Sequence, residues 1–402
     1  MTELRDQMPS TSAYARLAMA DVAQAAGLAN VQMLAWRDLD DPEAGGSEVH
    51  CSEIARVWSQ AGLGVNIRTS QVVNKVSRVE RDGYFVKRSS GRYSLFPAVV
   101  AGGFAGALPE HDGLIEIWNG MPFFSPLWSR KPAVVFLHHV HAEMWKMVLP
   151  NSLARLGWYL ESKIAPRVYR NSRIVTLSHS SKDEIVDLLG LNPDNISVIP
   201  PGIDPRFTPT ASKSREPLII SVGRLVKVKR FGPLIEIVTR LKSRHPGLRL
   251  VIAGEGDERA DLERLIDFHH ARDWILLPGR VSDDELIHLY SSAWILASNS
   301  QREGWGMTIT EAAACGTPCV VSQITGHVNA LEHGVSGMVA SDPAEFEAHL
   351  DSIMSDKDLR KKLSDGALAF SSNFSWQATA RGTLEELAME AMAHSKDKSR
   401  PR

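Results

Sequence analysis

Short apolar runs alternate with longer segments of helical period along the whole chain. The strand candidates are residues 31–36, 65–70, 114–120, 133–139, 173–179 and 196–202 in the first half, and 218–224, 248–254, 275–280, 294–300 and 319–323 in the second. Most of these runs end near Gly, Ser, His or Asn, and a helical pattern follows. Such alternation is typical of βαβ units, so the sequence predicts an α/β protein with parallel sheets.

The chain divides where proline, glycine and polar residues cluster, at residues 200–217. We expect a first domain over 1–204, with a helical extension over 1–29, and a second over 205–376. Residues 377–402 should form a helix that returns toward the first domain, followed by a disordered tail from Ser395. Because ligands of open α/β sheets bind at the carboxyl ends of the strands, a cleft between the two domains is the expected site.

Composition narrows the class of protein. The 402 residues carry a net charge of −2, which does not indicate a nucleic-acid partner. The three cysteines, Cys51, Cys315 and Cys319, form no disulfide framework and fit a reducing compartment. No apolar run approaches the roughly 18 residues of a membrane span. These features predict a cytoplasmic protein.

The first group of candidate ligand-binding residues lies in residues 301–321. Glu303 follows a strand and Glu311 lies in the helix after it, and the glycines Gly304 and Gly306 let the backbone approach a ligand closely. The N–H groups of Met307 and Thr308, at the helix start, form an anion site. The alternative is a capping box from Thr308 to Glu311, in which Glu311 only satisfies the helix start.

Two further loops fit the same chemistry. Arg224 and Lys229 follow the strand that ends at Gly223, where two cations can offset a diphosphate; the alternative is a pair of solvated charges. In the first half, Gly45 and Gly46 open a helix after the first strand and offer backbone donors. This turn is no dinucleotide fingerprint.

Together these segments resemble glycosyltransferase family 4 of the GT-B fold, which has two Rossmann-like domains. The motifs VGRLVKVKR, VIAGEGDE, LPGRVSDDELIHLYSSA, EGWGMTITEAAACGTPCV and HGVSGMV occur in the family's order, and VVFLHH and IPPGID match more loosely. The resemblance covers roughly residues 30–390. One departure is Arg230, where family members commonly have glycine.

The resemblance implies a role for each matching residue. Arg224 and Lys229 would hold the donor diphosphate, with Gly46 contacting it through its backbone. Glu311 would bind the ribose and Glu303 the transferred sugar. The segment of Arg280 and Val281 would line the base pocket. His138 would lie beside the sugar, although the choice among His138, His139 and His141 stays open.

Metal sites are disfavoured by the residues themselves. Alternate side chains of His138, His139 and His141 point to opposite faces if the strand continues, so a shared ion would need a bend. The acidic string Asp38–Asp41 is interpreted as loop and capping material. Residues 254–265 lack the ending of a nucleotide-binding loop, and the glycine-rich residues 101–108 are expected to form a packing loop.

We therefore expect a retaining, metal-independent hexosyltransferase that uses a UDP- or GDP-sugar as donor substrate, without a cofactor, and a small-molecule, glycan or lipid-linked acceptor. The alternatives are a nucleotide-sugar epimerase, a phosphorylase, or a binding protein without turnover. The helix expected over 152–170 also has two interpretations. In one, an apolar stripe packs into the core; it consists of Leu153, Leu156, Leu160 and Ile164. In the other, the basic and aromatic residues of the helix contact the inner face of an anionic membrane.

Overall fold

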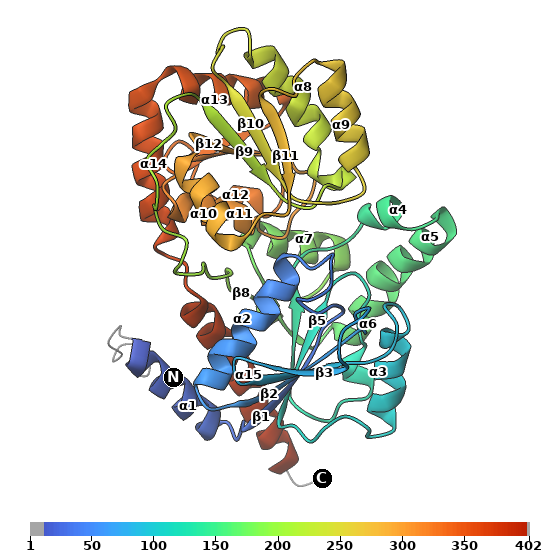
Figure 1. The fold of residues 1–402 in the computed structure, drawn as a ribbon. Helices are drawn as coiled ribbons and strands as arrows, with labels where there is room; N and C mark the ends of the chain where they lie inside the picture. The colour runs from blue at the N-terminus through green and yellow to red at the C-terminus, as the bar shows by residue number, and fades with distance from the viewer. Residues whose placement is uncertain (1–11, 400–402) are drawn as a thin grey trace. The chain divides into compact units, whose positions relative to one another are not determined.

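The structure, a computed structural model, describes residues 12–399, and these divide into two compact units. Unit 1 contains the chain up to Gly202 and again from Trp376, and unit 2 contains Ile203–Ser375 (Figure 1). The sequence placed the corresponding boundaries after residues 204 and 376. Among the described residues, none of the helices is both long and apolar enough to cross a membrane.

Unit 1 is built on an eight-stranded sheet with the order β3-β4-β2-β1-β5-β6-β7-β8. Its strands are β1 (Asn30–Leu34), β2 (Gly64–Thr69), β3 (Arg78–Arg81), β4 (Tyr84–Arg88), β5 (Gly113–Trp118), β6 (Ala133–Leu137), β7 (Arg173–Thr176) and β8 (Ile196–Val198). All neighbours pair in parallel except β3, which is antiparallel to β4. The predicted parallel sheet is thus present, with an antiparallel edge strand that was not among the strands expected from the sequence.

The β3–β4 hairpin was not predicted, although the sequence contains a turn signal between its two strands. Asp82 and Gly83 connect the two strands, and both have positive φ, 45° and 89°. Aspartate followed by glycine is among the preferred pairs for such two-residue turns. The hairpin brings two arginines, Arg81 and Arg88, into the unit, and both bear on the candidate site below.

The helices of unit 1 follow the predicted alternation. They are α1 (Ser12–Ala25), α2 (Gly46–Gln60), α3 (Leu95–Phe104), α4 (Met144–Val148), α5 (Asn151–Tyr159), the π-helical turn η2 (Leu160–Ile164), α6 (Ala165–Tyr169), α7 (His179–Leu189) and α15 (Trp376–Ser399), with short 3₁₀ turns η1 (Ser125–Leu127) and η3 (Pro193–Asn195). Two expectations were wrong. Residues 101–104 belong to α3 rather than to a loop, and the tail from Ser395 is helical as far as Ser399.

Unit 2 has a six-stranded, fully parallel sheet with the order β11-β10-β9-β12-β13-β14. Its strands are β9 (Leu218–Val222), β10 (Arg249–Ala253), β11 (Ile275–Gly279), β12 (Ile295–Ser298), β13 (Cys319–Ser322) and β14 (Gly337–Ala340). Its helices are the 3₁₀ turn η4 (Lys227–Lys229), α8 (Phe231–Leu241), α9 (Arg259–Phe268), α10 (Asp283–Ser292), α11 (Met307–Ala314), α12 (His327–Ala330), α13 (Pro343–Ser355) and α14 (Lys357–Ser371). The strand β14 was not predicted.

The central strands explain why each unit folds around its sheet. All six residues of β5 are buried, and β9 and β10 are each buried at four of five positions. A parallel strand buried on both faces requires helices on both sides of the sheet, and the near-continuous apolar runs of the sequence satisfy that requirement. The loops that leave the carboxyl ends of the strands are then free to carry chemistry.

Candidate active site

The loops at the carboxyl edge of the unit 2 sheet are held against one another by their backbones. The N–H of Gln301, after β12, donates to the carbonyl of Val228, after β9, at 2.7 Å. A side chain at Gly254 would place its Cβ 1.9 Å from the carbonyl oxygen of Gly223, so only glycine permits this approach of two loops. The segments that carry Arg224, Lys229 and Glu303 therefore form one surface.

Lys229 and Glu303 meet on this surface. The ammonium of Lys229 donates to the carboxylate of Glu303, which also accepts from the hydroxyl of Ser300 at 3.0 Å. Burial would raise the pKa of Glu303, but the Lys229 charge and hydrogen bond and the nearby His327 outweigh it, so its pKa is lowered. Both side chains keep nearly a fifth of their surface exposed, 19% and 18%, so a ligand can reach them.

The helix after Glu303 begins two residues earlier than the capping-box interpretation requires. The N-cap of α11 is Gly306, with φ of 101°, and no side-chain hydrogen bond caps the helix. Glu311 therefore lies beyond the first turn, and the capping interpretation is wrong. Met307 and Thr308 occupy the first two helical positions, where backbone N–H groups have no acceptor within the helix and can donate to an anion.

Glu311 has a different partner, which no motif in the sequence identifies. Its carboxylate accepts a hydrogen bond from the hydroxyl of Tyr290, on α10, at 3.0 Å. Burial raises the pKa of Glu311 to about 7, although the Tyr290 bond opposes the shift. A carboxyl group that titrates near neutrality gains much by binding a hydroxyl donor in its charged form.

The remaining predicted positions of unit 2 lie on the same edge. Arg224 is partly buried on the loop after β9, and Arg280 is exposed directly after β11. The backbone N–H of Gly254 donates to the carbonyl of Gly279 at 2.8 Å, which fixes the end of β11 next to β10. Val281 follows Arg280 and is partly buried.

In unit 1, the Gly45–Gly46 turn starts α2 and is fixed by a buried ion pair. The carboxylate of Glu48 accepts from the N–H of Gly45 at 2.8 Å and from Nε of Arg37 at 3.1 Å. Glu48 and Arg37 are both buried. The turn is thus rigid, and the Gly45 N–H is already engaged, which leaves the N–H groups beyond it, from Gly46 onward, as the candidate donors.

The three histidines after β6 separate into two groups. His138 is buried, and its Nε2 lies 3.2 Å from Nδ1 of His50 on α2. The rings of His139 and His141 instead stack on each other, with centroids 4.9 Å apart. No cluster of three metal-binding side chains occurs in residues 12–399. The sequence analysis missed His50, because nothing in its spacing links it to His138.

The shifts of the two paired histidines have one main cause. Burial lowers the pKa of His50 to about 3 and that of His138 well below its ordinary value, and the proximity of the two rings lowers His138 further. Both imidazoles are therefore neutral at pH 7. In this state His138 can exchange hydrogen bonds with a neutral hydroxyl but carries no charge of its own.

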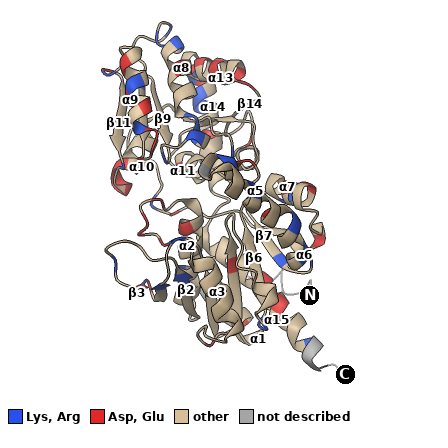
Figure 2. Ribbon diagram, turned by 90° about the vertical axis from the view of Figure 1, so that its right-hand side faces the viewer, with Lys and Arg blue, Asp and Glu red and all other residues tan. Residues whose placement is uncertain are grey.

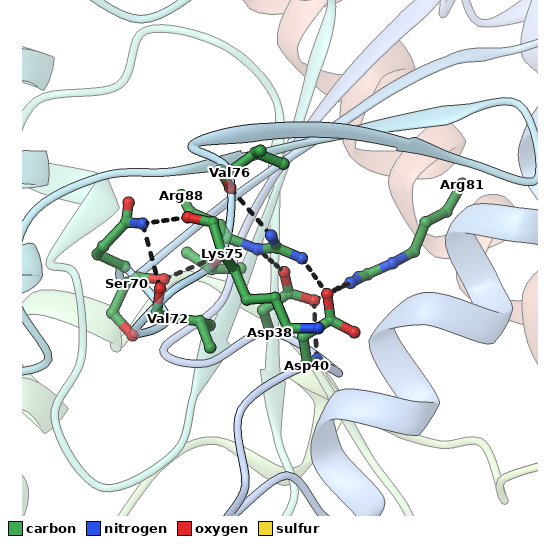
Figure 3. A network of polar contacts seen from close by, with 10 residues as sticks. Asp38, Asp40, Ser70, Val72, Lys75, Val76, Arg81 and Arg88 are labelled. Carbon is green, nitrogen blue, oxygen red and sulfur yellow. Dashed lines mark hydrogen bonds and ion pairs between the residues drawn. The ribbon is translucent and has the colours of Figure 1, made fainter.

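Two carboxylates of the acidic string after β1 form ion pairs with arginines (Figure 3). Asp38 accepts from Arg81 and Arg88, and Asp40 pairs with the same two side chains. Burial would raise the pKa of Asp38, but the two guanidinium groups lower it overall. The string therefore anchors the loop to the β3–β4 hairpin, and its two carboxylates are engaged by cations of the protein.

Two family models match consecutive parts of the chain. Residues 44–207 match Glycosyltransferase Family 4, and residues 204–369 match Glycosyl transferases group 1. The chain belongs to the family 4 glycosyltransferases. The resemblance recognised from the sequence motifs is thereby confirmed.

Curated relatives of this family 4 member are moderately similar. The D-inositol 3-phosphate glycosyltransferase of Acidothermus cellulolyticus is 31% identical over 234 residues, which cover 53% of this chain and 52% of the relative. That of Xylanimonas cellulosilytica is 27% identical over 398 residues, 87% and 94% of the two chains. In the first alignment this chain thus spans about half of the relative's length.

Solved structures confirm the GT-B fold. The sucrose-phosphate synthase of Thermosynechococcus elongatus superposes with a TM-score of 0.76 at 17% identity, over 92% of this chain and all of that one. Anabaena HepE in complex with UDP-glucose superposes with a TM-score of 0.68 at 16% identity, over 90% and 99%. At these identities the likeness concerns the fold alone.

Proposed function

We propose that this chain transfers a hexose-type sugar from a UDP- or GDP-sugar to an acceptor, with retention of configuration and without a metal ion. The observation that carries the proposal is the contact of Lys229 with Glu303 beside the uncapped start of α11. It joins a cation for phosphate, a carboxylate for sugar hydroxyls and backbone N–H donors on one edge of one sheet. Relatives named as glycosyltransferases, and HepE solved with UDP-glucose, support this choice of donor.

In the proposed mechanism, the acceptor attacks the sugar on the face that the diphosphate leaves. Arg224, Lys229 and the N–H groups of Met307 and Thr308 stabilise the negative charge that develops on the phosphate. One preorganised contact of this kind is typically worth about 3 kcal/mol in the transition state. Glu303 orients the transferred sugar, and Glu311 binds the ribose hydroxyls.

The other assigned residues complete the proposal. Arg280 and Val281 line the base pocket, and Gly304 and Gly306 let the loop approach the donor. In unit 1, we assign the Gly45–Gly46 turn a role in donor binding through its backbone N–H groups, and His138 a role as a neutral hydrogen-bonding group. Because the positive charge opposite the phosphates comes from side chains and helix N–H groups, turnover needs no divalent cation or other cofactor.

The test is a screen of UDP- and GDP-sugars by thermal shift, followed by assays of donor hydrolysis and transfer. A donor at 100 times its dissociation constant should stabilise the protein by about 2.7 kcal/mol. Release of the nucleoside diphosphate with the sugar's anomeric configuration kept, in excess EDTA, is the expected outcome. Interconversion of the sugar without loss of the nucleotide would instead show an epimerase, and binding without any product would show a protein without turnover.

A further inference from the structure

The α4–α5 segment of unit 1 exposes large apolar side chains. Met147 of α4 is 41% exposed, and on α5 Leu153, Leu156 and Tyr159 are 51%, 52% and 54% exposed. In a single helix of nine residues, three large apolar side chains thus lie mainly in solvent. We call these four side chains the α4–α5 surface. An apolar cluster of this kind on a protein's exterior commonly marks an interaction site.

The core face of the same helix explains why the large side chains point outward. Ala154 and Gly157 are the buried positions of α5, and the ring of Trp145, on α4, packs against Gly157. A Cβ at Gly157 would lie 2.7 Å from that ring. Small residues therefore form the contact of α5 with the rest of unit 1. The interpretation that the leucine stripe packs into the core is wrong for Leu153 and Leu156.

The surface is held in place from beneath. Glu161, in the π-helical turn after α5, is fully buried. Its carboxylate accepts from the backbone N–H of His141 at 2.8 Å, from that of Ala142 at 3.2 Å and from the indole of Trp145 at 2.8 Å. Because one buried carboxylate ties the loop, α4 and the helix together, the exposed apolar side chains are presented from a fixed scaffold.

Basic side chains accompany the apolar ones. Within residues 143–170 five residues are basic and two are acidic, and one of these acids is the buried Glu161. The basic side chains are all exposed; they are Lys146, Arg155, Lys163, Arg167 and Arg170. In the ribbon of Figure 2, blue marks the lysine and arginine positions. The chain as a whole has a net charge of −2, so this positive charge is local.

We propose that the α4–α5 surface binds the face of an anionic lipid bilayer, with Leu153, Leu156 and Tyr159 inserted among the headgroups and the basic side chains on the lipid phosphates. Leucine and aromatic residues next to lysine and arginine on an exposed helix suit this interface, where apolar burial and charge attraction add. A purely apolar partner surface would leave the five cations without counter-charge. The proposal does not rest on the proposed glycosyl transfer, because its test measures binding alone.

The experiment is sedimentation of the full chain with vesicles of phosphatidylcholine alone or with 30% phosphatidylglycerol, in 50 mM and 300 mM salt. We expect binding to the anionic vesicles at low salt, weakening as salt rises. The triple variant Arg155→Gln, Lys163→Gln, Arg167→Gln should bind at least tenfold more weakly, since each cation near the bilayer contributes about fivefold. The variant Leu153→Ser, Leu156→Ser, Tyr159→Ser should also lose at least tenfold.

Matched controls use exposed side chains of unit 2. Phe268 is 76% exposed, and Arg264 and Lys361 are exposed cations, so Phe268→Ser and the pair Arg264→Gln, Lys361→Gln should bind as the parent does. Circular dichroism and melting curves verify that each variant is folded. Equal binding by the parent and both triple variants, or no binding to anionic vesicles, would overturn the proposal. So would a dimer that the Leu153, Leu156 and Tyr159 changes dissociate, since the surface would then bind a second copy.

Discussion

Lys229 donates a hydrogen bond to the carboxylate of Glu303, so the cation assigned to the donor phosphate is engaged by the carboxylate assigned to the donor sugar. The two residues are 74 positions apart and reach each other only because β9 and β12 are neighbours in the unit 2 sheet. A donor that binds here exchanges this contact for its own phosphates and hydroxyls. In the proposed mechanism, Lys229 then stabilises the leaving group during transfer.

The first prediction concerns the two cations. Lys229→Ala and Arg224→Ala should each lower kcat/KM for the donor by roughly 100- to 1000-fold, because each removes a charge-assisted contact worth about 3–4 kcal/mol in the transition state. Lys227→Ala is the matched control, since Lys227 is exposed on the same 3₁₀ turn. It should retain nearly full activity. Steady-state rates and melting temperatures of all three variants decide the matter, and near-parental rates for Lys229→Ala and Arg224→Ala contradict the diphosphate assignment.

The second prediction follows from Glu311. Its pKa is raised to about 7 in the folded protein, above the 4.5 of a free glutamate. The folded state therefore holds a proton that the unfolded state has lost, and its stability falls as pH rises from about 4.5 to 7. Glu311→Gln cannot lose this proton, so it should unfold with a weaker pH dependence and be more stable at pH 7.5 by up to about 3 kcal/mol.

Nucleotide binding gives the same residue a second measurement. Ribose hydroxyls donate to the charged carboxylate, so binding of UDP or GDP should release a proton near pH 6.5 and tighten as pH rises to 8. Calorimetry in buffers of different ionisation enthalpy measures that proton. The Glu311→Gln variant should bind several-fold more weakly and release fewer protons than the parent, since only the proton of the nucleotide's own terminal phosphate then remains to be released. Equal affinity of the variant and the parent would leave Glu311 with a structural role only.

The third prediction uses the backbone of Arg230, where family members commonly have glycine. Arg230 is the N-cap of α8 and has φ of 54°, in the left-handed region that disfavours side chains. Arg230→Gly should stabilise the protein by about 0.5–1 kcal/mol, because the relief of strain exceeds the added freedom of the unfolded chain. Arg230→Ala keeps the strain and should show no such gain. Urea unfolding curves compare the three proteins, and a less stable glycine variant contradicts the argument.

Comparison of these residues shows what the sequence can predict. Strand ends and their loops follow from apolar runs and turn residues, so the positions of Arg224, Lys229 and Glu303 on one sheet edge were predictable. The hydrogen-bond partners of the site residues could not be predicted from the sequence. Tyr290 meets Glu311 from a different helix, and His50 meets His138 from another element, because such contacts depend on packing between segments far apart in the chain. The capping interpretation of Glu311 failed because Gly306, with no side chain to cap, starts the helix two residues earlier than the Thr308 of the motif.

The last prediction concerns the ion pairs that Asp38 forms with Arg81 and Arg88, on the loop before the Gly45–Gly46 turn. Arg88 and Asp38 are both buried, and Arg88 binds Asp38 while Arg81 binds it from the other side. Arg88→Met leaves a buried carboxylate with half of its compensation, which should lower the free energy of unfolding by about 3 kcal/mol. The added change Asp38→Asn removes the uncompensated charge and should restore part of that loss. The control is Arg78→Met, which changes an exposed arginine on the same hairpin and should leave the stability nearly unchanged.

Because Asp38 lies on the loop that leads into the Gly45–Gly46 turn, Arg88→Met should also raise the KM for the donor more than it lowers kcat. Chemical unfolding of the single and double variants, with kinetics at a temperature where all are folded, measures both effects. If Arg88→Met is as stable as the parent, Arg81 alone holds the loop. If its KM for the donor is unchanged, the ion pairs of Asp38 do not affect donor binding.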